Sequence, residues 1–123
     1  MARVLVVDDA EFVRMRMRRL LAEHGYEVVE ADNGLSAVHQ YRAEHPDLVF
    51  MDITMPLLDG ISAVREIRKE DPGASIVMCS AAGQQAMVIE ALKAGAKDFI
   101  IKPYQPEKIL EAIGKFMHKG EPH

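Results

Sequence analysis

The sequence is 123 residues long, the size of one domain with a substantial buried core. Its formal net charge is -4 and 28% of its residues are charged, so the composition gives no reason to expect nucleic-acid or anionic-membrane binding. The first apolar run is too short for a signal peptide, and no run approaches the ~20 apolar residues of a membrane span. We therefore expect a cytoplasmic monomer whose partners are other proteins.

Short apolar runs alternate along the chain with segments of helical periodicity. The first run, 4–7, precedes apolar residues at helical spacing over 13–21, a stop at Gly25 and a second run at 26–29. The next helical segment centres on 37–41 and ends near Pro46, before a strand at 48–51. Further helices are expected around 61–67, 88–92 and 109–117, with strands at 76–79 and 99–101 between them.

Five strands that alternate with five helices predict an α/β fold. Right-handed crossovers place helices on both faces of a parallel sheet, which gives a single three-layer doubly wound (βα)5 domain. In the strand order 2-1-3-4-5, the first and third strands lie side by side. The single cysteine, Cys79, lies within an apolar run and is expected to be a buried residue without a redox or metal role.

Three of the apolar runs end on polar residues, namely Asp8-Asp9, Asp52 and Lys102. The carboxyl ends of parallel strands line the ligand crevice of such a sheet, so the three aspartates are expected to converge. Two unit charges ~4 Å apart repel by about 4 kcal/mol at an effective dielectric near 20, and a bound cation removes this cost. An all-oxygen ligand set favours Mg²⁺ over Ca²⁺ or Zn²⁺. Taken alone, Asp8 would be better explained as a cap of the first helix.

A carboxylate beside Mg²⁺ and a lysine is suited to attack phosphorus, because aspartate can carry a phosphoryl group as an acyl phosphate. One carboxylate of this group is then the candidate nucleophile, with Lys102 as a second source of positive charge. Ser80 follows the fourth apolar run and supplies a hydroxyl at the same edge. Each residue has a plainer explanation in isolation, since such a serine is more often a helix cap and such a lysine is usually solvated.

Together these motifs resemble those of two-component response-regulator receiver domains, from Arg3 to about Met117. The matching segments are Asp8-Asp9, Met51 to Pro56 with Asp59-Gly60, Ser80-Ala81 and Lys102-Pro103. Within the family, the stretches 79–90 and 97–100 are similar to the stand-alone chemotaxis regulators of Gram-positive and thermophilic bacteria. The resemblance implies a flavodoxin-like receiver domain over residues 1–119, followed by a disordered tail at 120–123.

The resemblance also implies roles for individual residues. Asp52 would be the phosphoacceptor, assisted by Lys102 and Ser80, and the Lys102-Pro103 bond would be cis. The groups implied around Mg²⁺ are the side chains of Asp8, Asp9 and Asp52 and the carbonyl of Thr54. Such a domain is a signalling switch that promotes its own phosphorylation and dephosphorylation, and it is not otherwise an enzyme.

The switch and the phosphoryl lifetime map by resemblance onto four positions. Ser80 and Phe99 would form the switch, while Thr54 and Ala82 would tune how long the phosphoryl group survives. Phe99 lacks the hydroxyl of the tyrosine that is frequent at its position, so an exposed rotamer should be less favoured. A plain core residue on its strand is an equally good explanation of Phe99. Ala82 cannot orient an attacking water whereas Thr54 can, so the sequence leaves the lifetime open.

The function implied is a switch that accepts phosphate on Asp52 from a histidine kinase of the chemotaxis type and then binds a flagellar motor protein. A chemotaxis phosphatase is a further expected partner. The output face would be formed by the fourth helix, fifth strand and fifth helix, around Gln85, Met87, Lys93, Phe99, Tyr104 and Gln105. Four arginines on the first helix are expected to form a solvated face rather than a nucleic-acid site, and these are Arg14, Arg16, Arg18 and Arg19.

Other functions fit the sequence less well. A phosphorelay intermediate or a receiver cut from a larger response regulator stays open within the same family. A Mg²⁺-dependent phosphohydrolase resembling haloacid dehalogenases would place a second aspartate where this chain has Thr54. A flavodoxin-type FMN carrier is excluded because Asp8-Asp9 occupies the first turn, where a phosphate needs glycine and hydrogen-bond donors.

Overall fold

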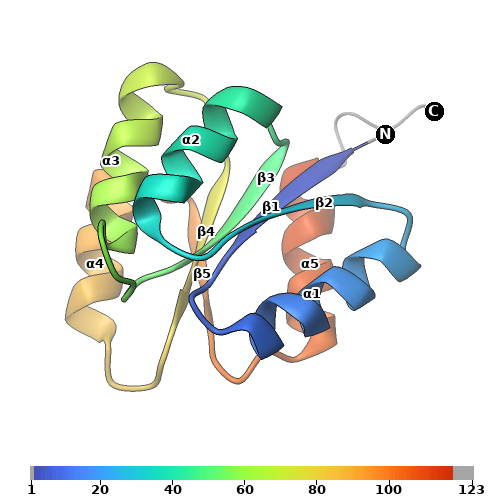
Figure 1. The fold of residues 1–123 in the computed structure, drawn as a ribbon. Coiled ribbons are helices and arrows are strands. Elements are labelled where there is room, and N and C mark those ends of the chain that lie inside the picture. The colour runs from blue at the N-terminus through green and yellow to red at the C-terminus, as the bar shows by residue number, and fades with distance from the viewer. Residues whose placement is uncertain (1, 118–123) are drawn as a thin grey trace.

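The computed structural model describes residues 2–117, and five strands and five helices alternate along them (Figure 1). The strands are β1 (Arg3–Val7), β2 (Glu27–Ala31), β3 (Leu48–Asp52), β4 (Ile76–Ser80) and β5 (Asp98–Ile101). The helices are α1 (Glu11–Glu23), α2 (Gly34–Glu44), α3 (Gly60–Glu70), α4 (Gln85–Ala94) and α5 (Pro106–Met117). The expected domain end at 119 and the tail at 120–123 lie outside the described residues.

The strands form one parallel sheet in the order β2-β1-β3-β4-β5, which confirms the predicted fold and strand order. The pairing of β1 with β3 aligns Val7 with Met51, so the residues that follow, Asp8 and Asp52, lie next to each other. On the other side of β3, Asp52 pairs with Cys79, which brings the end of β4 to the same edge. The sheet topology therefore determines which strand ends meet.

Side chains alternate across each strand and fill two separate layers of core, because successive residues of a strand point to opposite faces. On one face, Leu5, Val49 and Met78 pack with the buried sides of α2, α3 and α4. On the other face, Val6, Phe50 and other strand residues pack with α1 and α5. Figure 1 shows these two helix groups on opposite sides of the sheet. The central strands are buried on both faces, which explains their continuous apolar runs.

The helix limits follow from local chemistry. Asn33 and Asp59 each accept a backbone N–H bond from the residue three positions later, and so cap α2 and α3. Gly95 ends α4 with φ +126°, a left-handed conformation that favours glycine. None of the helices within residues 2–117 is long and apolar enough to cross a membrane.

Gly60 is expected to be indispensable for the backbone at the end of β3. A Cβ at this position would lie 2.0 Å from the carbonyl oxygen of Asp52, which is rigid backbone. Gly60→Ala should therefore lower the free energy of unfolding by about 2 kcal/mol or more, as overpacking does. Chemical denaturation followed by circular dichroism measures the loss.

Gly114→Ala is the matched control, because a Cβ at Gly114 would meet no atom within 4 Å apart from the backbone of its own helix and its chain neighbours. In a helix interior this change should raise the free energy of unfolding by about 0.5–1 kcal/mol. Equal effects of the two substitutions would contradict the steric account of Gly60.

Candidate functional site

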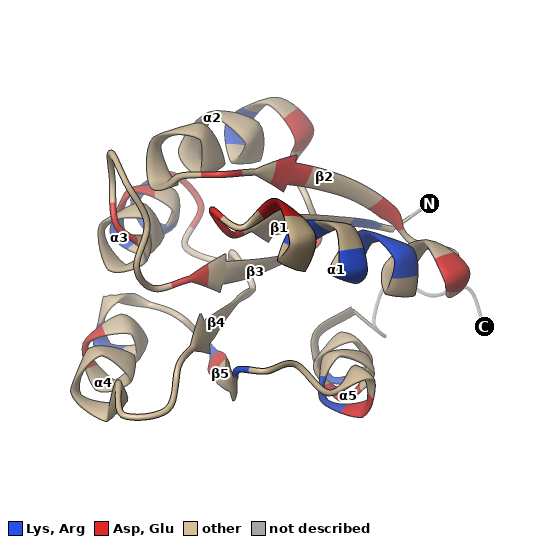
Figure 2. Ribbon diagram, turned by 60° about the horizontal axis from the view of Figure 1, so that its bottom comes forward, with Lys and Arg blue, Asp and Glu red and all other residues tan. Residues whose placement is uncertain are grey.

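Three carboxylates converge at the carboxyl edge of the sheet, as the sequence predicts. One oxygen each from Asp8, Asp9 and Asp52 lies within 4.8 Å of the others. Asp8 is 1% exposed and Asp52 6% exposed, whereas Asp9 faces solvent. Figure 2 shows acidic segments after β1 and at the tip of β3. A compact group of carboxylate oxygens that opens to solvent on one side fits a hard divalent cation.

Lys102, which follows β5, lies between two of these carboxylates. Its Nζ is 2.9 Å from Oδ2 of Asp8 and 3.1 Å from Oδ1 of Asp52. Burial lowers the pKa of Lys102, but the hydrogen bond to Asp8 and the charge of Asp52 outweigh burial and raise it overall. The lysine is thus a charged member of the acidic group, and the alternative of a solvated surface lysine is wrong.

The pKa of Asp52 is raised above its ordinary value. Burial is the largest cause and repulsion from Asp8 the next, while Lys102 opposes both. The ionised form of Asp52 is therefore destabilised by its surroundings, even with an ammonium group nearby. A bound cation, or the removal of negative charge from the Asp52 carboxylate, relieves this electrostatic cost.

Asp8 has partners for both of its oxygens. Oδ1 accepts a hydrogen bond from the backbone N–H of Ala10 at 2.9 Å, just before α1 begins. Oδ2 accepts from Lys102 and also from the hydroxyl of Tyr104 at 3.3 Å. The cap residue of α1 is Ala10, so Asp8 serves the acidic group rather than acting only as a cap.

Tyr104, which the sequence analysis assigns to the output face, has a second place in the molecule that the sequence does not predict. Its hydroxyl reaches into the acidic group and donates to Asp8. Burial raises the pKa of Tyr104, as do contacts with Cys79 and the charges of Asp8 and Asp52, so the hydroxyl stays a donor. Its position two residues after Lys102 was the only signal in the sequence.

The remaining predicted site residues are Ser80, which ends β4, and Thr54 and Ala82, which lie on the loops after β3 and β4. Ser80 is buried at the end of β4, and Ala82 is exposed two residues later. Thr54 is exposed, and its hydroxyl oxygen accepts a hydrogen bond from the side chain of Gln84 at 3.3 Å. The same glutamine accepts the backbone N–H of Ala81 at 2.7 Å. Gln84 therefore links the loops that follow β3 and β4, a role with no sequence signal.

The switch candidate Phe99 lies on the edge strand β5 and is 41% exposed. The alternative of a plain core residue is therefore wrong, whereas the lower preference of phenylalanine than of tyrosine for an exposed rotamer stays a prediction. Ile100 packs against the α1 and α5 side of the sheet, so Phe99 points to the α4 side. Since α4 leaves this edge partly uncovered, the ring stays accessible. The predicted cis bond between Lys102 and Pro103 is present.

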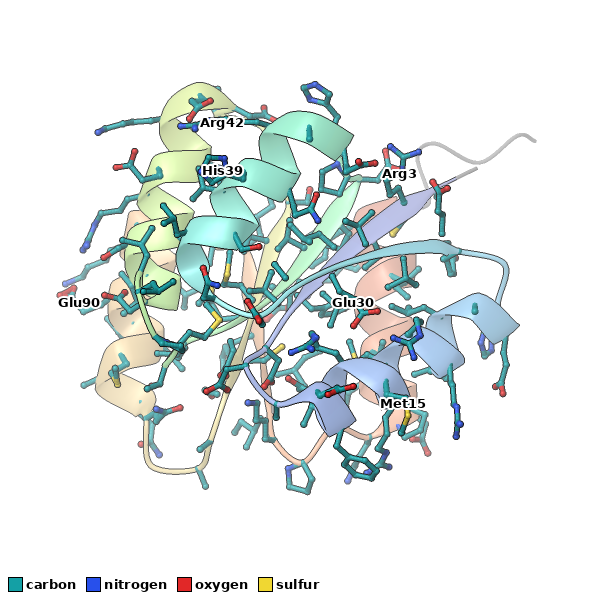
Figure 3. All side chains as sticks on the ribbon, viewed as in Figure 1. Arg3, Met15, Glu30, His39, Arg42 and Glu90 are labelled. Atoms are coloured by element: carbon teal, nitrogen blue, oxygen red, sulfur yellow. The ribbon has the colours of Figure 1, made fainter. Side chains whose placement is uncertain are left out.

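The arginines of α1 differ from one another. Arg16 and Arg19 are exposed, as expected, but the side chain of Arg14 is only 15% exposed. Arg14 donates to Glu30 of β2 at 3.1 Å and to the backbone oxygen of Asp8 at 2.7 Å. Figure 3 labels Glu30, which lies between β2 and α1. A solvated face is thus the wrong description for Arg14, which fixes the backbone at the acidic site.

Residues 4–114 match the family model described as the response regulator receiver domain, so the chain belongs to the response regulator receiver family. This places the acidic group in a domain of two-component signalling.

Within the family, the chain is 59% identical to the chemotaxis protein CheY of Thermotoga maritima over 114 residues, which are 92% of this chain and 95% of that protein. It is 56% identical to CheY of Bacillus subtilis over 117 residues, 94% of this chain and 98% of that protein. A solved receiver domain from Clostridium thermocellum is 27% identical with a TM-score of 0.91, covering 98% and 97% of the two chains. The chain is a CheY-like chemotaxis response regulator, a signalling domain, and the predicted resemblance is confirmed.

The raised pKa of Asp52 predicts the pH dependence of one substitution. An acid whose pKa is higher in the folded chain than in the unfolded chain destabilises the fold wherever it is ionised. Asp52→Asn cannot ionise, so in metal-free buffer near neutral pH it should raise the free energy of unfolding by about 1 kcal/mol. Below the ordinary carboxyl pKa of about 4 the difference should disappear, because Asp52 is then protonated in both states.

Urea titrations of the two proteins across this pH range, with a chelator present, measure the difference. A less stable variant near neutral pH would show that the contact with Lys102 outweighs burial and repulsion at Asp52.

Proposed function

We propose that this receiver domain accepts a phosphoryl group on Asp52 from a histidine kinase of the chemotaxis type, and that phosphorylation changes its affinity for a flagellar motor-switch protein. The observation that carries the proposal is the convergence of Asp8, Asp9, Asp52 and Lys102 at one edge of the sheet. Three negative groups and one positive group within a few ångströms are suited to a phosphoryl group and a divalent cation. The similarity to two CheY proteins supports the chemotaxis assignment.

The transfer would proceed by in-line attack on phosphorus. An oxygen of the ionised Asp52 forms the new O–P bond, the P–N bond of the donor phosphohistidine breaks, and the imidazole leaves and takes up a proton. The ammonium of Lys102, which already touches Asp52, would turn to an oxygen of the incoming phosphoryl group. The proposed product is an aspartyl phosphate.

Mg²⁺ is the cofactor proposed for this site. The groups that would hold it are the carboxylates of Asp8, Asp9 and Asp52 and the carbonyl of Thr54, and the first three already lie together. Bound there, the ion would supply positive charge opposite Lys102 for the phosphoryl oxygens. The donor set fits, because a carboxylate and carbonyl set suits a hard ion that keeps some of its water ligands.

The switch would begin at the two loops that border Asp52. Ser80 would offer its hydroxyl to the phosphoryl group, and its place at the end of β4, next to β3, supports this role. Thr54 and Ala82 would tune the lifetime, and the Thr54 hydroxyl, which accepts a hydrogen bond from Gln84, keeps its own O–H to orient water. Phe99 would then change its exposed position beside α4.

The output surface would be the α4, β5 and α5 face. Exposed apolar residues support this proposal, since an edge strand and its neighbouring helix present Ile89, Leu92, Phe99 and Ile101 at 38–53% exposure. Such a patch suits a helical or extended segment of a partner protein. A flagellar motor-switch protein is the proposed target, and a chemotaxis phosphatase is a second proposed partner.

Acetyl phosphate with Mg²⁺ should label the protein with one alkali-labile phosphoryl group, and Asp52→Asn should abolish the label because it removes the nucleophile. Intact-mass spectrometry measures the labelled fraction. Asp47→Asn is the control, since Asp47 is an exposed aspartate before β3 that lies outside the acidic group.

The control should be labelled as the unaltered chain is. Persistent labelling of Asp52→Asn would show that another residue is the acceptor, and absence of any label on the unaltered chain would contradict the phosphoacceptor function.

Beryllofluoride, which mimics a phosphoryl group on aspartate, should tighten binding of a flagellar motor-switch protein by about tenfold or more, as a coupling energy of 1–3 kcal/mol allows. Phe99→Ala should weaken the activated complex by about 1–2 kcal/mol, as for an exposed aromatic in an interface. Calorimetric titration measures both effects. Leu35→Ala is the control, because Leu35 is 50% exposed on α2, away from this face. Equal affinity with and without beryllofluoride would contradict the switch.

A further inference from the structure

The hydroxyl of Tyr104 makes a contact that links two distant parts of the chain. It donates to Oδ2 of Asp8 at 3.3 Å, across 96 positions of sequence. Tyr104 lies between β5 and α5, whereas Asp8 directly follows β1. A phenol keeps its proton near neutral pH, because its ordinary pKa is about 10. The contact is thus a hydrogen bond from a neutral donor to a buried carboxylate.

The ring of Tyr104 is held in place on two sides. It packs against the core layer that contains Cys79 and Ile109, so its orientation is fixed by the β5–α5 side of the fold. Its centroid lies 6.0 Å from the ammonium of Lys102, within the range of a cation–π contact. Tyr104 therefore hydrogen-bonds Asp8 and lies within cation–π range of Lys102, while its ring is anchored outside the acidic group.

The Tyr104 hydroxyl differs from Lys102, which is the other donor to Oδ2 of Asp8. Lys102 divides its ammonium between Asp8 and Asp52. If the ammonium of Lys102 turns toward a phosphoryl oxygen, it holds Asp8 less tightly. The hydroxyl of Tyr104 is bonded to Asp8 independently of that ammonium. With the N–H of Ala10 on Oδ1, the hydroxyl on Oδ2 fixes both ends of a carboxylate that is 1% exposed.

We propose that Tyr104 is a positioning residue of the acidic site, whose hydroxyl holds the Asp8 carboxylate in the orientation that metal binding requires. The inference rests on the Mg²⁺ site of the proposed function and adds a residue to it. Hydrogen-bond partners of ligating carboxylates fix their orientation, and their loss costs about 10–100-fold in metal affinity. The distance of 3.3 Å between the Tyr104 hydroxyl and Oδ2 of Asp8 is long for a hydrogen bond, so we expect a loss of metal affinity near the lower end of that range of about 10–100-fold.

The test is Tyr104→Phe, which removes the hydroxyl and keeps the ring that packs in the core. The dissociation constant of Mg²⁺ should rise about tenfold in the variant. Titration of the unphosphorylated protein with Mg²⁺, followed by amide NMR shifts, measures this dissociation constant without any phosphorylation step. The backbone amide of Ala10 donates to Asp8. Its resonance in metal-free Tyr104→Phe should therefore differ from that in the metal-free unaltered chain.

Tyr41→Phe is the matched control. The Tyr41 hydroxyl likewise donates to an aspartate, Asp71, at 2.6 Å, but this pair lies in the α2 and α3 region outside the acidic group. The control should lose stability as a buried hydrogen bond is lost, and yet bind Mg²⁺ within about twofold of the unaltered chain, because it spares the carboxylates that bind metal. Thermal unfolding with a chelator compares the stability of the two variants.

Three outcomes would overturn the inference. They are unchanged Mg²⁺ affinity in Tyr104→Phe, an equal loss of affinity in Tyr41→Phe, and absence of Mg²⁺ binding by the unaltered chain. Labelling by acetyl phosphate separates this inference from the proposed function. If the unaltered chain binds Mg²⁺, Tyr104→Phe binds it weakly and neither is labelled, the phosphoacceptor function fails while the positioning role stands. If both proteins are labelled and bind Mg²⁺ alike, the positioning role fails alone.

Discussion

The parallel pairing of β1 with β3 is the constraint on which the rest of the site depends. It aligns the last apolar residues of the two strands, Val7 and Met51, so the next residues bring two buried carboxylates together. Like charges at this range repel strongly in a partly buried site. The fold holds them there because both strands are packed on both faces and cannot shift to relieve the repulsion.

This repulsion makes the site responsive to charge. The pKa of Asp52 is raised by burial and by Asp8, although Lys102 lies between the two carboxylates. The free energy of the site therefore changes whenever a cation enters or the charge on Asp52 changes. A rigid sheet edge with an unfavourable charge balance is the physical basis of the proposed switch, because a ligand that binds one conformation better than another shifts the equilibrium toward it.

The side chains around the acidic group connect it to the rest of the surface. Gln84 joins the loops after β3 and β4 at the start of α4. Tyr104 joins Asp8 to the segment between β5 and α5, and Phe99 is exposed on β5 nearby in sequence. A change at Asp52 that alters these loops would reach the α4, β5 and α5 surface through short, packed segments.

The sequence by itself determined the strands and the carboxylates at their ends, because continuous apolar runs and helical spacing are local patterns. The strand order was predicted from the doubly wound fold class, and the pairing in the sheet confirms it. The predicted limits of the strands and helices differ from those in the structure by only a few residues. Only the tertiary structure decided that Tyr104 contacts Asp8, that Arg14 is held by Glu30, and that Phe99 is exposed. Such contacts join residues far apart in the chain, and a side chain's orientation depends on neighbours that no local pattern specifies.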